Sequence, residues 1–182
     1  MLLPTQPTPP TDLLVVFGKQ GMVYLMDRTN LGKYNPLGNQ VLQTLPAGTV
    51  PTAHSMPAYW QNNVYFCGVS DVLKSFLLSN GLLSTSPTSV SATAYGYPGS
   101  TPAVSANGNA NGIVWAISTS NGGFAELHAY DASNLAHELY NTTQNLTRDK
   151  AGLLIKFSVP TVANGKVYVG TQTELDVYGL LP

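Results

Sequence analysis

A repeated Ser-X-Pro triplet most constrains what this chain can fold into. The triplets contain Pro57, Pro102 and Pro160, at a spacing of roughly 50 residues. Each is followed by a short apolar run, a polar turn containing Asn, and a second run rich in β-branched and aromatic residues. Such a turn between two such runs is a strong hairpin signal. The chain is therefore predicted to repeat one antiparallel β unit.

A third run follows each of these hairpins and alternates apolar and polar residues. This period of two predicts strands with one buried face at 72–78, 126–131 and 174–180. Upstream, residues 13–18 and 22–27 match the second and third strands of a further unit without its first strand. Weaker fourth strands are placed at 41–45, 81–84 and 138–140.

Four strands in a unit of this length are typical of a β-propeller blade, because one blade cannot bury both of its faces alone. We predict an all-β fold of four-stranded antiparallel blades, with about three and a half to four blades in a partial or self-associating ring. The alternative is a β-sandwich, which also has many short strands. A Pro-rich lead-in is predicted at 1–11, before one repeat domain at 12–182 with units near 12–48, 55–92, 100–145 and 152–182.

Composition excludes several classes of protein. Charged residues make up 9% of the chain, hydrophobic residues 43%, and the formal net charge is −1. Low charge with this much apolar material argues against disorder, and the few cations argue against nucleic-acid binding. No apolar run is long enough to span a bilayer. Cys67 is the single cysteine and lies in an apolar run, which predicts a buried small side chain.

The chain resembles the pyrroloquinoline-quinone-like β-propeller repeat family, and more narrowly the C-terminal portion of exported bacterial proteins of that kind. The motifs that carry the resemblance are 54–67, 127–135, 138–141 and 156–171. The resemblance implies a secreted or periplasmic protein, although the N-terminal sequence has no signal-peptide pattern. Quinone-dependent members have a vicinal cysteine pair, which Cys67 cannot supply, so a quinone cofactor is not predicted. No cofactor is assigned; calcium stays an alternative, and the metal is left unknown.

An incomplete ring would leave open strand edges, which soluble proteins avoid. We therefore expect either a homo-oligomer or the remainder of a larger propeller to complete it. A compact four-bladed ring is the less favoured solution.

Candidate site residues are expected on the loops that lead into the first strand of each unit and on the hairpins that share their face. His54 and Asp71 are the catalytic candidates, His54 as a general base or metal ligand and Asp71 as a base or ligand. Ligand-binding candidates are Tyr95, Tyr97, Arg148, Asp149 and Lys156.

The sequence is compatible with three functions. The first is a non-catalytic propeller scaffold or binding module, since no nucleophile elbow, dinucleotide loop or zinc-protease motif is present. The second is a divalent-cation-dependent hydrolase that acts on a lactone or ester at the channel mouth. A quinone-dependent oxidoreductase-like protein ranks third.

Overall fold

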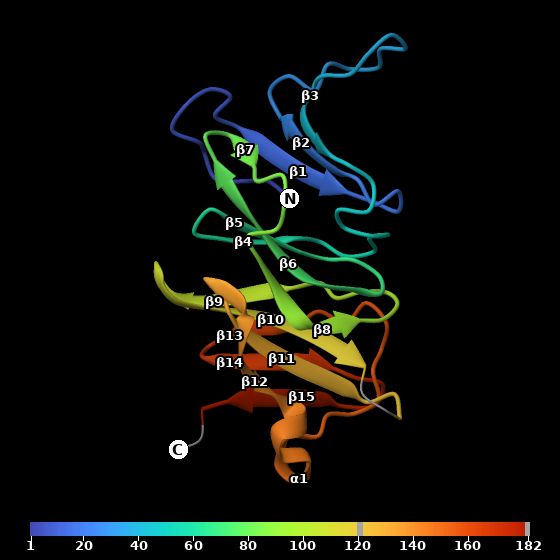
Figure 1. Cartoon of the computed structure of the whole chain (residues 1–182). Coiled ribbons are helices and arrows are strands. Elements are labelled where there is room, and N and C mark those ends of the chain that lie inside the picture. Colours follow the sequence, from blue (N-terminus) through green and yellow to red (C-terminus); the bar gives the residue numbers. More distant parts are fainter. Residues whose placement is uncertain (120–121, 181–182) are drawn as a thin grey trace.

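The computed structural model describes residues 1–119 and 122–180 of the chain. The protein is all-β: half of it lies in strands and 4% in helix. Four antiparallel sheets follow one another in chain order, from the N-terminal sheet at one end of the molecule to the C-terminal sheet at the other (Figure 1). The all-β prediction is confirmed at this level. No closed barrel or ring is formed by the described residues.

The first sheet contains β1 (Leu13–Phe17), β2 (Val23–Asp27) and β3 (Val41–Leu45). The segment Met1–Leu3 lies antiparallel along the free edge of β1, with hydrogen bonds from Leu3 N to Leu13 O and from Val15 N to Met1 O. Residues predicted as lead-in thus occupy the place of the missing first strand. The sequence gives no sign of this pairing, because only three residues make it and a Pro-rich loop follows.

The second sheet has β4 (Ala58–Trp60), β5 (Asn63–Cys67), β6 (Asp71–Ser79) and, at its outer edge, β8 (Ser89–Tyr95). The short β7 (Leu82–Leu83) pairs with the far end of β6. The fourth strand predicted at 81–84 is therefore only a two-residue hairpin arm. The long outer strand is β8, whose small polar residues give little apolar signal.

The third sheet contains β9 (Ala103–Asn107), β10 (Ala110–Thr119), β11 (Ala125–Asp131) and β12 (Asn134–Asn141). A 3₁₀ turn (Thr142–Asn145) and the short helix α1 (Leu146–Asp149) follow. The fourth sheet contains β13 (Thr161–Ala163), β14 (Lys166–Gly170) and β15 (Leu175–Gly179). None of the described helices is long and apolar enough to cross a membrane.

Three separate apolar clusters lie between successive sheets. The alternation along β5 shows how they form: Val64 and Phe66 pack toward the first sheet, while Tyr65 and Cys67 pack toward the third. A third cluster joins Ile117 and neighbouring residues of the third sheet to the fourth sheet. Each inner sheet is thus buried on both faces, unlike a two-layer sandwich, which has a single core.

The Ser-X-Pro repeat has a structural basis. The Ser55 hydroxyl donates to Cys67 O at 2.9 Å, and the Ser158 hydroxyl donates to Gly170 O at 2.7 Å. Each bond joins the start of a first strand to the end of the second strand in the same sheet. The hydroxyl of Ser100 instead accepts from Ile117 N at 2.9 Å. The triplet therefore marks the same place in three sheets.

Candidate functional site

Three loops from different parts of the chain meet at one surface cluster, which comprises His54, Tyr97, Lys156 and Phe157. The His54 ring makes edge-to-face contacts with Tyr97 and Phe157, at centroid distances of 5.3 and 6.3 Å. The Lys156 ammonium lies 5.1 Å from the centre of the Tyr97 ring. These loops lead into β4, β9 and β13, so residues about a hundred positions apart share one site.

Backbone hydrogen bonds hold these loops between the hairpins of neighbouring sheets. In the loop before β4, Ala53 N donates to Gly18 O, while Thr52 O accepts from Val69 N. The loop before β13 repeats this pattern: Leu154 N donates to Gly123 O, and Leu153 O accepts from Gln172 N. The cluster therefore stands on a framework that the repeat itself provides.

The aromatic members of the cluster face solvent. Tyr97 is 53% exposed and Phe157 is 57% exposed, although both are large and apolar enough to be buried. Phe157 also has a φ of 70°, a left-handed conformation that is unfavourable for a bulky side chain. Strained residues of this kind gather at binding sites, where surrounding structure holds them in place.

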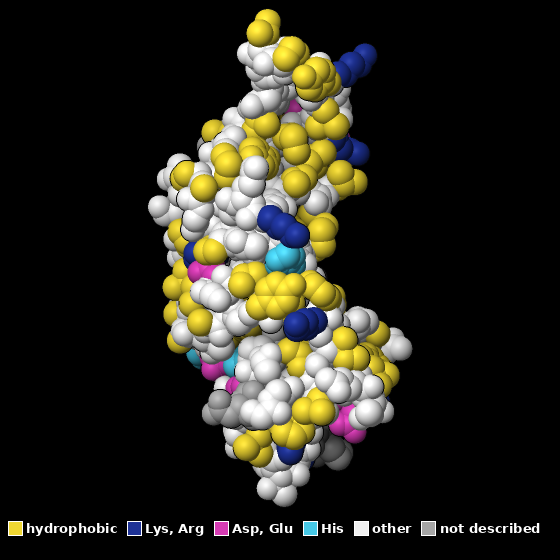
Figure 2. Space-filling model, turned by 90° about the vertical axis from the view of Figure 1, so that its right-hand side faces the viewer, with side chains coloured by type: hydrophobic (Ala, Val, Ile, Leu, Met, Phe, Trp, Pro, Cys, Tyr) yellow, Lys and Arg dark blue, Asp and Glu magenta, His cyan; other side chains and the backbone are white. Residues whose placement is uncertain are grey.

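The basic member of the cluster is Lys156. No acidic side chain of the described residues forms an ion pair with Lys156. Figure 2 shows a face of the molecule where histidine and basic side chains lie among hydrophobic ones, beside a hollow. Exposed rings offer stacking surface, and the ammonium offers a partner for an anion. The arrangement is suited to a ligand that has both an apolar or aromatic body and a negative group.

Asp71 pairs with Lys74 and not with a member of this cluster. Its Oδ2 lies 2.8 Å from Lys74 Nζ, and both side chains are largely buried. Asp71 Oδ2 accepts no hydrogen bond from this ammonium, which donates instead to Thr49 O at 2.9 Å. The contacts of His54 do not include Asp71. No hydrogen bond, ion pair or ring contact of the described residues joins the two catalytic candidates, and it is Lys74 that ties β6 to the loop before β4.

Tyr95 lies inside the protein, although it was predicted to line the loop face. It is fully buried at the end of β8, and its hydroxyl lies 2.9 Å from that of Tyr130. Burial raises the pKa of Tyr95 well above its ordinary value. The physical reason for the misplacement is that residue 95 ends an outer strand whose alternation points its ring into the core. Tyr97, two residues on, has left the strand.

Arg148 and Asp149 form a bidentate ion pair on α1, with Nη2 to Oδ2 at 2.7 Å. Arg148 lowers the pKa of the Asp149 carboxyl. Both residues line a hollow of about 720 Å³ between the third and fourth sheets, together with Tyr140 and Tyr178. They contribute nothing to the contacts around His54. The pair lies within α1, which the Tyr178 hydroxyl links to β15 by donating to Asp149 O at 3.1 Å, and the guanidinium is already occupied by a carboxylate.

A buried polar network was not foreseen from the sequence. His128 Nε2 lies 2.9 Å from Ser118 Oγ, and His128 Nδ1 lies 2.6 Å from Glu138 Oε1. The order of hydroxyl, imidazole and carboxylate is that of a Ser-His-acid triad. However, His128 is 2% exposed and its ring contacts those of Tyr95 and Tyr130. Its members lie on three adjacent strands, and only the cross-strand register aligns them.

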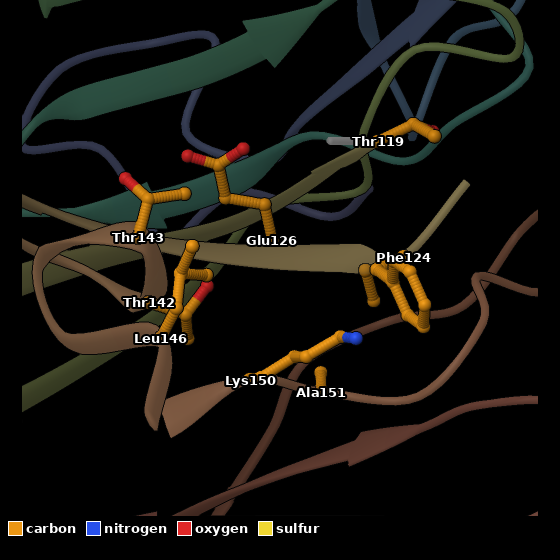
Figure 3. Close-up of a pocket in the computed structure, with 9 residues that line it drawn as sticks. Thr119, Phe124, Glu126, Thr142, Thr143, Leu146, Lys150 and Ala151 are labelled. Atoms are coloured by element: carbon orange, nitrogen blue, oxygen red, sulfur yellow. The ribbon is translucent and has the colours of Figure 1, made fainter. Parts of the chain in front are cut away.

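A second hollow, of about 650 Å³, lies beside β11, the 3₁₀ turn and the segment after α1. The Lys150 ammonium lies 3.6 Å from the centre of the Phe124 ring, while the Glu126 carboxylate points away from Lys150 (Figure 3). None of these residues was predicted as a site residue. A buried Thr142 and an exposed Leu146 close one side of the hollow.

Among residues 1–119 and 122–180, no group of three or more His, Cys, Asp or Glu side chains is arranged to hold a metal ion. Calcium therefore has no assigned ligand set. Comparison with known proteins adds no further assignment: no protein-family profile, curated protein sequence or solved structure matches this chain.

Proposed function

We propose that the protein is a binding module built from propeller-type blades, and that the cluster of His54, Tyr97, Lys156 and Phe157 binds its ligand. The resemblance to pyrroloquinoline-quinone-like repeats is part of this proposal. The loops that lead into β4, β9 and β13 converge at that cluster. The first strands themselves also neighbour one another, β4 beside β9 and β9 beside β13. Convergence of this kind is expected where blades surround a common axis.

The observation that carries the binding role is the exposure of two aromatic rings around a lysine that forms no ion pair with an acidic side chain of the described residues. Binding is favourable when a flat ligand covers rings that are otherwise exposed to water. An anion beside the ammonium adds a charge-assisted contact. We infer that the ligand combines an aromatic or apolar body with a carboxylate, sulfonate or phosphate. A hydrolase remains the alternative. The hydroxyl–imidazole–carboxylate set at Ser118 has its imidazole enclosed, which favours a structural role.

The experiment is a titration with 2-naphthoate, followed by its fluorescence and by two-dimensional NMR. We expect weak saturable binding, with shifts confined to the loops around His54 and Tyr97. Neutral 2-naphthalenemethanol should bind at least about tenfold more weakly, since the loss of one charged contact costs about 1.5 kcal/mol or more. Tyr97→Ala and Lys156→Gln should each weaken naphthoate binding at least about fivefold.

Matched controls are Tyr34→Ala and Lys33→Gln, which change an exposed tyrosine and lysine in the loop between β2 and β3. These variants should bind naphthoate as the parent does. Equal loss in cluster and control variants, or no saturation at millimolar naphthoate, would contradict the proposal. Labelling of Ser118 by a fluorophosphonate, abolished in His128→Asn, would instead support the hydrolase.

A further inference from the structure

The two end sheets expose side chains at positions that are buried everywhere else in the stack. In each sheet, one third-strand residue lies opposite a residue at or near the end of the second strand, on the side of the sheet that faces the following sheet. The pairs are Phe17–Val23, Cys67–Leu73, Ile117–Leu127 and Gly170–Leu175. Val23, Leu73 and Leu127 are at most 1% exposed, because each packs in the cluster shared with the following sheet. Leu175 is 62% exposed.

The rest of the fourth sheet's outer face follows the same rule. Val177 is 50% exposed, whereas Ser75, at the same register position in the second sheet, is buried. Tyr168 is partly exposed, whereas its counterpart Tyr65 is fully buried. We call this surface the forward face; it carries Tyr168, Leu175 and Val177. Residues at the equivalent positions of the other sheets are covered by the following sheet.

The first sheet presents the opposite surface. Val16 is 42% exposed, whereas its register counterpart in the second sheet, Phe66, is fully buried against the preceding sheet. Leu14 and Met26 lie on the same side of the sheet as Val16, and Leu2 beside Leu14 is mostly exposed. We call this surface the backward face; it carries Leu2, Leu14, Val16 and Met26. These four residues include no charged side chain.

We propose that a second copy of this chain covers both faces, the forward face of each copy packing on the backward face of the other. A forward face packs on a backward face three times within one chain, so the two surfaces left over are complementary by position. Covering them removes exposed apolar side chains from water. A head-to-tail contact of this kind closes into a ring if two copies complete the turn, and extends into a filament if they do not.

The test uses light scattering with size-exclusion chromatography on the whole chain across a range of concentrations. We expect a dimer of twice 19.3 kDa. Val16→Asp or Val177→Asp alone should raise the dimer dissociation constant at least about 100-fold, because each buries an unpaired carboxylate in both contacts. Leu37→Asp, at an exposed loop position, is the control and should leave the dimer intact. Circular dichroism confirms that each variant is folded.

Mixing the two variants provides the decisive measurement. The Val16→Asp chain retains its forward face and the Val177→Asp chain retains its backward face, so an equimolar mixture regains one undamaged contact. We expect the mixture to form a heterodimer at concentrations where each variant alone is monomeric. A parent protein that is monomeric at 0.1 mM would overturn the proposal. So would a dimer that only one variant disrupts, since that result indicates a contact between like faces, or a mixture that fails to associate.

Discussion

The Nδ1 atom of His128 lies 2.6 Å from Oε1 of Glu138, across the β11–β12 pair. The opposite ring nitrogen contacts the Ser118 hydroxyl on β10, so this imidazole links three strands of one sheet. The ring itself stacks on Tyr130 at an interplanar angle of 8°. A buried imidazole whose two nitrogens both have partners stabilises one arrangement of the strands. The loss of either partner would leave a buried polar atom without a hydrogen bond.

Removal of the Glu138 carboxylate should therefore destabilise the third sheet. We expect Glu138→Ala to lower the free energy of unfolding by about 1–3 kcal/mol, since His128 Nδ1 then lacks its acceptor. Glu138→Gln is the matched control, because it removes the charge and retains an oxygen that accepts a hydrogen bond. Its cost should be smaller. Urea unfolding followed by fluorescence measures both, and equal costs would contradict a role for the hydrogen bond.

The repeated serines give a second prediction. Ser55→Ala and Ser158→Ala each remove a hydroxyl that donates to a carbonyl at the end of a second strand. We expect each to lower the free energy of unfolding by about 1 kcal/mol. Ser86→Ala, at an exposed position between β7 and β8, should change it by less than about 0.5 kcal/mol. A cost at Ser86 equal to that at Ser158 would show that the repeat has no such function.

The repeat could be predicted from the sequence because strand alternation and turn chemistry are local properties. Strands such as β5 and β10 combine β-branched and aromatic residues with a polar turn before them, and both signals depend on neighbours in the chain. The outer strand β8 was missed, since Ser89–Tyr95 is built mainly from Ser, Ala and Thr. Its place is fixed by pairing with β6, which is a long-range property.

The candidate site was only partly predictable for the same reason. His54, Tyr97 and Lys156 were selected because they lie on loops that share a face, and the structure brings these three together. Phe157 was not selected, because an aromatic residue after a lysine carries no signal of its exposure or its positive φ. The network at His128 depends on cross-strand register, which one sequence does not specify.

A third prediction concerns two glycines at equivalent positions. Gly18 and Gly68 each follow the last residue of a second strand. A methyl group on Gly68 would lie 2.0 Å from Pro51 O, whereas one on Gly18 would meet nothing within 4 Å. We expect Gly68→Ala to destabilise the protein by about 2 kcal/mol or more, since backbone must move, and Gly18→Ala to change little. Thermal unfolding of the two variants provides the comparison. Similar melting temperatures would contradict this prediction and would mean that the loop before β4 moves at little cost to accommodate the methyl group.

The last prediction concerns Cys67, which is fully buried between the second and third sheets. Burial raises the pKa of its thiol to about 12, and the reactive thiolate is therefore scarce at pH 8. We expect Ellman's reagent to react with the native protein at least about 100-fold more slowly than with the protein in guanidinium.

The unfolded thiol ionises near pH 8.5, so the unfolded state binds fewer protons than the folded state above that pH. Stability should fall as pH rises from about 9 to 12. Cys67→Ala should reduce this fall without abolishing it, because burial also raises the pKa of Tyr65. Rapid reaction of the native thiol, or stability that is constant across this range, would contradict the buried position of Cys67.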